Sequence, residues 1–175
     1  MSRDVLILTA SPSATSRSTF VARQIAAHAE RNGFSAHYFA PGDFDAADLI
    51  FGRGTAPAAV RFLDAVAKAE AIVLATPVYK ATYSGALKTV VDLIPPEALV
   101  GKHALGVATT RLPAHRSEVD RAYQSLFAFF RARPAETLVV LDEELQIGEQ
   151  GGTLTPAAEL RIARAAQALV AHTPS

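Results

Sequence analysis

The chain has 175 residues, a length that corresponds to about one domain. Half of its residues are hydrophobic and 19% are charged, which is the composition of a chain with a buried core rather than of a disordered one. Seventeen basic residues balance seventeen acidic ones, so the charge excess typical of nucleic-acid-binding proteins is absent. The sequence has no cysteine, which excludes disulfides, thiolate metal sites and a cysteine nucleophile.

No stretch reaches the roughly 18 consecutive apolar residues of a membrane helix. The first apolar run, residues 5–8, is too short for the core of a signal peptide. The absence of cysteine fits a reducing compartment. We therefore expect a soluble, cytoplasmic protein with one domain over residues 1–175 and with no membrane or nucleic-acid partner.

Short apolar runs, typical of strands buried on both faces, alternate with helix-like stretches. In chain order, the predicted strands are 5–10, 35–39, 71–76, 103–109 and 136–141, and the predicted helices are 18–32, 57–68, 84–93, 117–131 and 155–171. This alternation indicates a parallel sheet with helices on both faces. Five strands suit a flavodoxin-like, three-layer α/β fold with strand order 2-1-3-4-5 better than a six-stranded dinucleotide fold. Residues 41–54 and 143–153, rich in glycine and charge, are predicted to be the least structured.

The loop between the first predicted strand and the first predicted helix is rich in hydroxyl groups and has one cation, Arg17. A helix N-terminus has unpaired N–H groups and a positive dipole, so the loop suits a phosphate monoester at the carboxyl end of the sheet. The alternative is ordinary helix capping by Ser16 or Ser18. No G-x-G-x-x-G or P-loop motif is present, which disfavours those nucleotide sites. The loop has more hydroxyl side chains than helix capping requires. They are Ser11, Ser13, Thr15, Ser16 and Ser18.

The loop after the third predicted strand begins with Pro77 and has two tyrosines, Tyr79 and Tyr83. In a doubly wound sheet this loop neighbours the first one across the switch point of the strand order. A flat aromatic ligand lying against residues 77–79 would place its phosphate in the serine-rich loop. The alternative is that both tyrosines are half-buried packing residues.

Residues 77–89 read Pro-Val-Tyr-Lys-Ala-Thr-Tyr-Ser-Gly-Ala-Leu-Lys-Thr and closely resemble the signature of the NAD(P)H-dependent FMN reductases. Within that family, the sequence looks most like the alkanesulfonate-utilisation flavin reductases. The stretches 10–12 and 16–18 are similar to the family's phosphate loop. The resemblance covers roughly the whole chain, through residues 43–51, 99–102, 114–115 and 119–120.

The resemblance implies a flavodoxin-like protein that binds FMN, reduces it with NADPH or NADH, and supplies reduced flavin to a partner monooxygenase. It also implies a homodimer or homotetramer with the flavin site near a subunit interface. Hydride transfer to flavin N5 needs no protein nucleophile, so we name no catalytic residue. The spacing of the histidines predicts no metal site. By this resemblance the phosphate would be held by Ser11, Ser16, Arg17 and Ser18, the ring would be bordered by Pro77, Val78, Tyr79 and Tyr83, and Lys80 would serve the flavin or the nicotinamide nucleotide.

The sequence departs from the family after the fourth predicted strand. Many relatives have a Gly-Gly turn against the flavin ring, whereas Thr110 and Arg111 occupy that turn here and do not freely give the close backbone approach that glycine allows. One hypothesis places Arg111 at the pyrimidine end of the flavin, where its charge would stabilise the anionic reduced form. The alternative is a solvent-facing arginine.

The predicted helix 117–131 also differs from some relatives, which have an inserted tyrosine linked to tetramer assembly. Arg121 stands at that position, and Tyr123 follows two residues later. The apolar side chains of this helix wrap more than one face, which favours packing against a second subunit over burial within a monomer. These side chains are Leu126, Phe127, Phe129 and Phe130.

Two other functions stay open from the sequence. One is a quinone or azo reductase that keeps FMN bound through its cycle. The other is a non-catalytic flavodoxin-like binding module in which Arg111 blocks the ring site.

Overall fold

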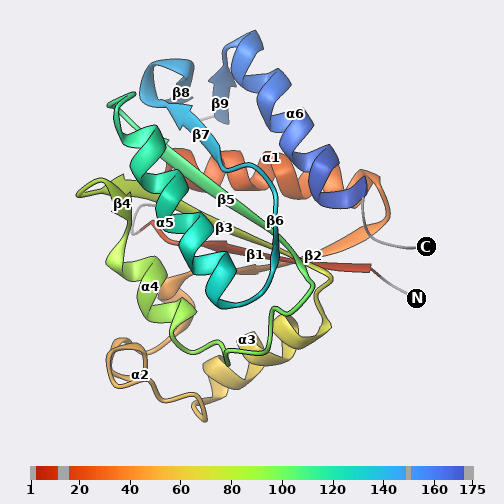
Figure 1. Ribbon diagram of the computed structural model, residues 1–175, viewed down its shortest axis with the longest axis vertical. Helices are drawn as coiled ribbons and strands as arrows, with labels where there is room; N and C mark the ends of the chain where they lie inside the picture. The colour runs from red at the N-terminus through yellow and green to blue at the C-terminus, as the bar shows by residue number, and fades with distance from the viewer. Residues whose placement is uncertain (1–2, 12–15, 149–150, 172–175) are drawn as a thin grey trace.

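The computed structural model describes residues 3–11, 16–148 and 151–171. A parallel sheet runs through its centre in the order β2-β1-β3-β5-β6, and β7 follows β6 along the outer side of β5 (Figure 1). Among the parallel strands, β5 is the fourth along the chain, and β6 and β7 together form the fifth. The strand order is therefore 2-1-3-4-5, and the predicted flavodoxin-like fold is confirmed. The parallel strands are β1 (Arg3–Thr9), β2 (Phe34–Phe39), β3 (Ala71–Tyr79), β5 (His103–Thr110), β6 (Arg133–Pro134) and β7 (Leu138–Leu141).

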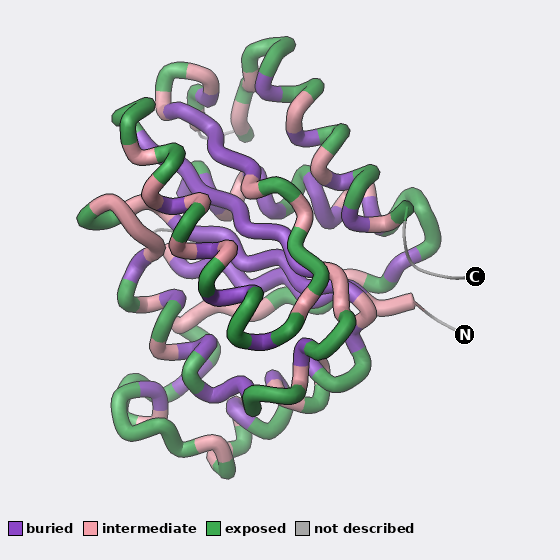
Figure 2. Tube along the Cα trace, in the orientation of Figure 1, coloured by how far each residue is buried: buried purple, intermediate pink, exposed green. Residues whose placement is uncertain are grey.

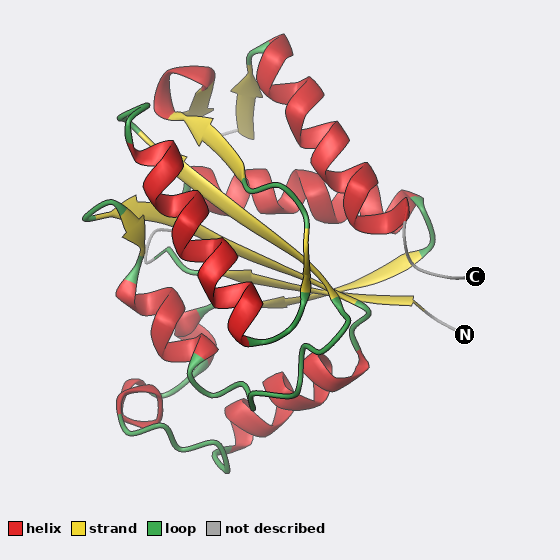
Figure 3. Ribbon diagram, in the orientation of Figure 1, coloured by secondary structure: helices red, strands yellow, loops and turns green. Residues whose placement is uncertain are grey.

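Helices cover both faces of this sheet, as Figure 3 shows. One face packs against α1 (Arg17–Arg31) and α6 (Pro156–Ala171), and the other against α3 (Pro57–Lys68), α4 (Gly85–Val91) and α5 (His115–Phe129). Because both faces are covered, the central strands β1, β3 and β5 are nearly continuous apolar runs, and they are the most deeply buried part of the structure (Figure 2). No helix within the described ranges is long and apolar enough to cross a membrane.

Apart from α5, whose N-cap is Ala114, the helices begin where the sequence provides a capping side chain or a proline. Ser16 accepts a hydrogen bond from the Thr19 N–H at 3.4 Å, and Thr155 accepts one from the Ala158 N–H at 3.3 Å. Pro57 opens α3 at a position where a missing N–H costs nothing. These local signals explain why the predicted helix positions agree with the structure to within a few residues.

The structure also contains elements in the two segments predicted to be least structured. Asp45 caps the short helix α2 (Ala46–Ile50) through hydrogen bonds from two backbone N–H groups. The strands β8 (Leu145–Gly148) and β9 (Gly151–Leu154) form an antiparallel hairpin outside the main sheet. At Gly152 an added Cβ would lie 2.9 Å from the Phe20 ring, so this hairpin packs against the first turns of α1.

The outer strand is irregular where β6 ends and β7 begins. Ala104 pairs with Pro134 and Val107 pairs with Leu138, so the outer strand advances by one residue more than β5. This bulge, together with Pro134 and the exposed carboxylate of Glu136, makes the edge a poor template for pairing with another strand.

Candidate functional site

The loops with the predicted site residues meet at the carboxyl edge of the sheet. The Ala10 N–H donates a hydrogen bond of 2.8 Å to the carbonyl of Ala75, and the Ser84 hydroxyl donates one of 3.1 Å to the carbonyl of Ala10. The end of β1 is therefore attached both to β3 and to the start of α4. Ser11, the first predicted phosphate ligand, follows directly from this junction and is partly exposed.

Two serines of the predicted phosphate loop lie at the start of α1. The Ser16 hydroxyl caps the helix and lies 2.9 Å from the hydroxyl of Ser18. Ser18 is fully buried, so a contribution from it to phosphate binding would pass through Ser16. Capping by Ser16 is thus present in the structure, and it leaves the positive end of the helix dipole at this edge. Ser13 and Thr15 lie outside the described residues.

Arg17 is the exposed cation of this loop. Its Nε atom lies 3.9 Å from Oδ1 of Asp142 and donates a hydrogen bond of 3.4 Å to the carbonyl of Leu145. Both partners belong to the segment that follows β7. The first and the last loops of the carboxyl edge are therefore joined through one guanidinium, a contact that the sequence analysis did not predict.

The segment after β7 is held by a partly buried carboxylate, that of Glu144. Its Oε2 accepts a hydrogen bond from the Leu141 N–H at 2.8 Å, and both of its oxygens accept from Arg161 at 2.7 and 2.8 Å. Partial burial raises the pKa of Glu144, but the Leu141 N–H and the Arg161 guanidinium outweigh it and bring the pKa below its usual value. Arg116 adds a more distant positive charge at 3.8 Å.

The predicted ring-binding residues lie on a hairpin at the end of β3. Strand β4 (Thr82–Tyr83) folds back so that Tyr79 pairs with Thr82. The two residues between them, Lys80 and Ala81, have φ angles of 53° and 65°, as in a type I′ turn, although neither is the glycine or asparagine usual there. Pro77 and Val78 are partly buried, and Tyr79 and Lys80 are exposed. A strained turn of this kind persists only where neighbouring structure holds it.

Two buried hydroxyls hold this hairpin, and the sequence analysis did not include them among the site residues. The Ser84 N–H donates a hydrogen bond of 3.0 Å to the Thr76 hydroxyl, which in turn donates one of 2.9 Å to the carbonyl of Pro77. Ser84 also caps α4 by accepting from the Leu87 N–H. A serine directly before a helix and a threonine at a strand end were the available signals.

Tyr123 supports the same hairpin from the sheet face. Its ring lies over Gly106, and its hydroxyl donates to the carbonyl of Leu74 at 2.8 Å, with the carbonyl of Val107 at 3.2 Å. Burial raises the pKa of Tyr123 well above its usual value, so the phenol stays protonated. The ring centroid of Tyr83 lies 5.7 Å away. Tyr83 thus packs in the way that the alternative interpretation described, while remaining partly exposed.

The turn after β5 forms without glycine. Neither Thr110 nor Arg111 has a positive φ. The buried Thr110 hydroxyl accepts a hydrogen bond from the Leu112 N–H and lies 3.2 Å from Nδ1 of His115, at the first position of α5. Arg111 is exposed at the carboxyl edge.

Four apolar side chains were noted in the sequence near the end of α5. Leu126, Phe127 and Phe130 are buried within the chain, whereas Phe129 is 64% exposed.

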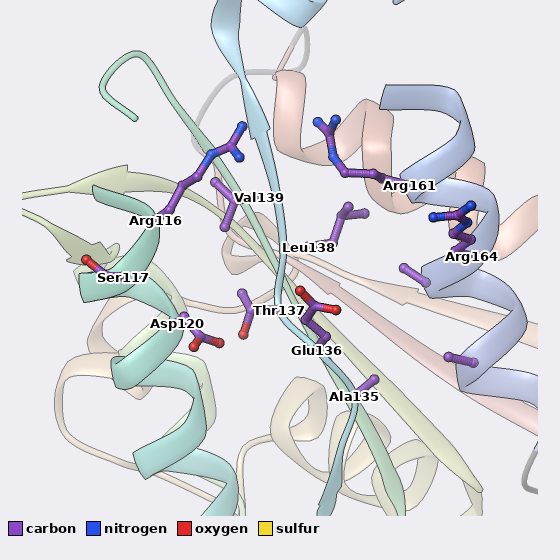
Figure 4. A pocket seen from close by; sticks show the side chains of 12 residues that line it. Arg116, Ser117, Asp120, Ala135, Glu136, Thr137, Leu138, Val139, Arg161 and Arg164 are labelled. Atoms are coloured by element: carbon purple, nitrogen blue, oxygen red, sulfur yellow. The ribbon is translucent and has the colours of Figure 1, made fainter. Parts of the chain in front are cut away.

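A groove of about 650 Å³ lies elsewhere, along the outer side of β7 between α5 and α6. Figure 4 shows Arg116 on one wall, Arg161 and Arg164 on the other, and Thr137 and Glu136 between them. The predicted flavin ligands do not line it. Ion pairs with Glu144 engage both Arg116 and Arg161, so the groove has no clear excess of free positive charge.

The residues at the carboxyl edge fit a flavin mononucleotide. Hydroxyls and a guanidinium at a helix N-terminus are suitable donors for a phosphate monoester. The partly buried strip of Pro77 and Val78, with the exposed Tyr79 beside it, provides an apolar border for a flat ring. The hydrogen bond between Ser84 and Ala10 keeps the two halves of this arrangement together.

Comparison with known proteins identifies the family. The sequence model described as NADPH-dependent FMN reductase matches residues 3–146. The chain belongs to this family. An FMN reductase (NADPH) of Pseudomonas putida is 35% identical over 150 residues, which cover 85% of this chain and 75% of that protein. An FMN reductase (NADPH) of Escherichia coli is 42% identical over 91 residues, which cover 52% of this chain and 48% of that protein.

The fold of the family is also found among solved structures. The apo form of an NADH:FMN oxidoreductase, EMOB, superposes with a TM-score of 0.89 at 23% sequence identity. The match covers 99% of this chain and 91% of the other. This likeness extends the agreement in fold beyond the residues matched by the family model, into β9 and α6.

Proposed function

We propose that this chain is a single-domain FMN reductase that transfers hydride from NADPH or NADH to FMN and supplies the reduced flavin to a flavin-dependent monooxygenase. The observation that carries the proposal is the hydrogen bond between the Ser84 hydroxyl and the carbonyl of Ala10. It joins the start of the phosphate loop to the ring-binding hairpin, so that one ligand with a phosphate and a flat ring can engage both. Family membership supports the choice of FMN as that ligand.

In this proposal the phosphate binds at the start of α1. Ser11 and Ser16 provide hydroxyls, Arg17 provides a guanidinium, and Ser18 orients Ser16 through the 2.9 Å contact between their hydroxyls. The helix dipole adds to the attraction for an anion. Because riboflavin has no phosphate, these residues would provide most of the preference for FMN over riboflavin.

The ring binds against Pro77, Val78 and Tyr79. When bound, the flavin supplies the hydride acceptor at N5, and the protein contributes stacking, orientation and electrostatics. Thr76 and Ser84 fix the start of the hairpin, and Tyr83 is braced by Tyr123. Fixed positions of this kind would orient a bound ring for hydride transfer.

Two exposed cations at this edge have separate roles in the proposal. Arg111, exposed at this edge, would lie near the pyrimidine end of a bound ring, where its charge would stabilise a negative charge on the flavin. Lys80, at the tip of the hairpin, attracts a phosphate of the flavin or of the nicotinamide nucleotide. The turn that presents Arg111 is held by the hydroxyl of Thr110 and is free of the strain that loss of glycine would otherwise cause.

We also propose that the protein acts in the cytoplasm as a homodimer or homotetramer. The exposed Phe129 at the end of α5 supports a face that is covered by a second subunit.

The test is anaerobic reduction of FMN by the purified protein, followed through the visible absorbance of the flavin. We expect reduction by NADPH or NADH to need the protein and the reduced flavin to pass through a gel-filtration column separately from it. Stoichiometric FMN that stays with the protein would favour the quinone or azo reductase instead. Absence of both binding and reduction would contradict the proposal.

A further inference from the structure

Arg17 is paired with a carboxylate of the chain itself. Its Nε lies 3.9 Å from Oδ1 of Asp142 and is also held by the carbonyl of Leu145 at 3.4 Å. Both side chains of the ion pair are partly exposed, at 44% for Arg17 and 31% for Asp142. A phosphate that binds Arg17 therefore meets a carboxylate beside the same guanidinium.

Asp142 cannot easily move away from this position. It begins the single turn Asp142–Glu144, and the last residue of that turn is fixed by Arg161 and by the Leu141 N–H at 2.7–2.8 Å. The hairpin that follows packs on α1, where Phe20 occupies the space left by Gly152. The turn that begins with Asp142 is therefore held by Glu144 and by the hairpin that follows it, which limits how far the Asp142 carboxylate can move from Arg17.

We propose that Asp142 is a specificity-determining residue that competes with the flavin phosphate for Arg17 and so weakens the binding of FMN. The inference rests on the proposed function, and it explains how that site avoids holding its product. Two negative groups that share one cation repel each other, so each binds less tightly than it would alone. An enzyme that must deliver reduced flavin elsewhere benefits because tight binding of the product would slow its release.

The experiment compares the dissociation constants of FMN and riboflavin on the apo-protein, measured by quenching of flavin fluorescence. Riboflavin has the same ring and no phosphate, so the ratio of the two constants isolates the phosphate contribution. The variants are Asp142→Asn, which keeps an oxygen near Arg17 but removes the charge, and Glu143→Gln, which removes a neighbouring charge. Within the described residues Glu143 is exposed and forms no ion pair, which makes it a matched control.

We expect Asp142→Asn to tighten FMN binding by roughly three- to fivefold, the range of a partly exposed charge pair, and to leave riboflavin unchanged. Glu143→Gln should change neither constant by more than about twofold. The gain in Asp142→Asn should shrink at high salt because exposed charges are screened. Unchanged or weaker FMN binding in Asp142→Asn, or an equal change for both flavins, would overturn the inference.

Arg17→Ala separates this inference from the proposed function. We expect this variant to lose much of the preference for FMN over riboflavin and to make Asp142→Asn neutral in the double variant. If Arg17→Ala keeps the full preference, the phosphate binds elsewhere and the proposed site is wrong. If the preference falls but Asp142→Asn has no effect in the otherwise wild-type chain, only the role of Asp142 is refuted.

Discussion

Replacement of Gly106 by alanine tests how the hairpin of β3 and β4 is supported. An added Cβ would lie 2.5 Å from Cγ of Tyr123 and 2.6 Å from its Cδ2. That ring is fully buried, stacks on Phe127 at 5.6 Å and is tethered through its hydroxyl to the carbonyl of Leu74. It must shift by about 1 Å to restore ordinary van der Waals contact.

The cost follows from these contacts. Overpacking a core of this kind costs about 1–3 kcal/mol, and loss of the Tyr123 hydrogen bond adds about 1 kcal/mol. We therefore expect the free energy of unfolding to fall by about 3 kcal/mol. For a protein of this size the midpoint of thermal unfolding should drop by roughly 6–12 °C.

Urea unfolding monitored by circular dichroism measures this change. Gly42→Ala is the matched control, because nothing lies within 4 Å of its added Cβ and its φ is not in the left-handed region. The double variant Gly106→Ala with Tyr123→Leu should lose less stability than the sum of the two single variants, since the smaller side chain leaves room for the methyl group. A Gly106→Ala protein within about 0.5 kcal/mol of the wild type would refute this account of the packing.

Three further predictions follow from individual side chains. Glu144→Gln should lower stability by about 2 kcal/mol at neutral pH, since hydrogen bonds to a charged group are lost. Because folding lowers the pKa of Glu144, its contribution is present above its usual value of 4.5 and is lost as the pH falls through the folded value, so the two unfolding curves should converge in acid. The Lys102 ammonium binds the carbonyls of Val66, Ala67 and Ala69 at the end of α3, so Lys102→Ala should cost about 1–2 kcal/mol without changing the KM for FMN; a KM change at unaltered stability would contradict this. Arg111→Gly should lower kcat/KM by roughly tenfold, the loss of one interaction with a charge, and leave unfolding unchanged; unaltered flavin affinity and reduction rate would show that Arg111 is only a solvent-facing side chain.

The fold was predictable because its signals are local. The buried strands are continuous apolar runs, and helices start at a capping residue or proline such as Ser16, Pro57 or Thr155. Strand β4 was not predicted, because two residues carry no periodicity and Lys80-Ala81 is not a usual left-handed turn sequence. The hairpin of β8 and β9 was not predictable, because a short segment rich in glycine and charge has no alternating apolar pattern.

The site was predictable only where its residues are close in sequence. The serine-rich loop and the segment 77–83 were each identified from their own residues, and the structure brings them to one edge. The partners that hold them come from distant parts of the chain, as with Asp142 beside Arg17 and Tyr123 beside Tyr83. No local pattern encodes such pairs.

The most direct test of the central claim is the oxidation of NADPH by the purified apo-protein with and without added FMN, followed through the near-ultraviolet absorbance of NADPH. An FMN reductase predicts oxidation that requires FMN and saturates with it, with weaker saturation by riboflavin because the phosphate site is left empty. NADPH oxidation that is unaffected by FMN would contradict the account. So would a protein that neither oxidises NADPH nor quenches the fluorescence of FMN.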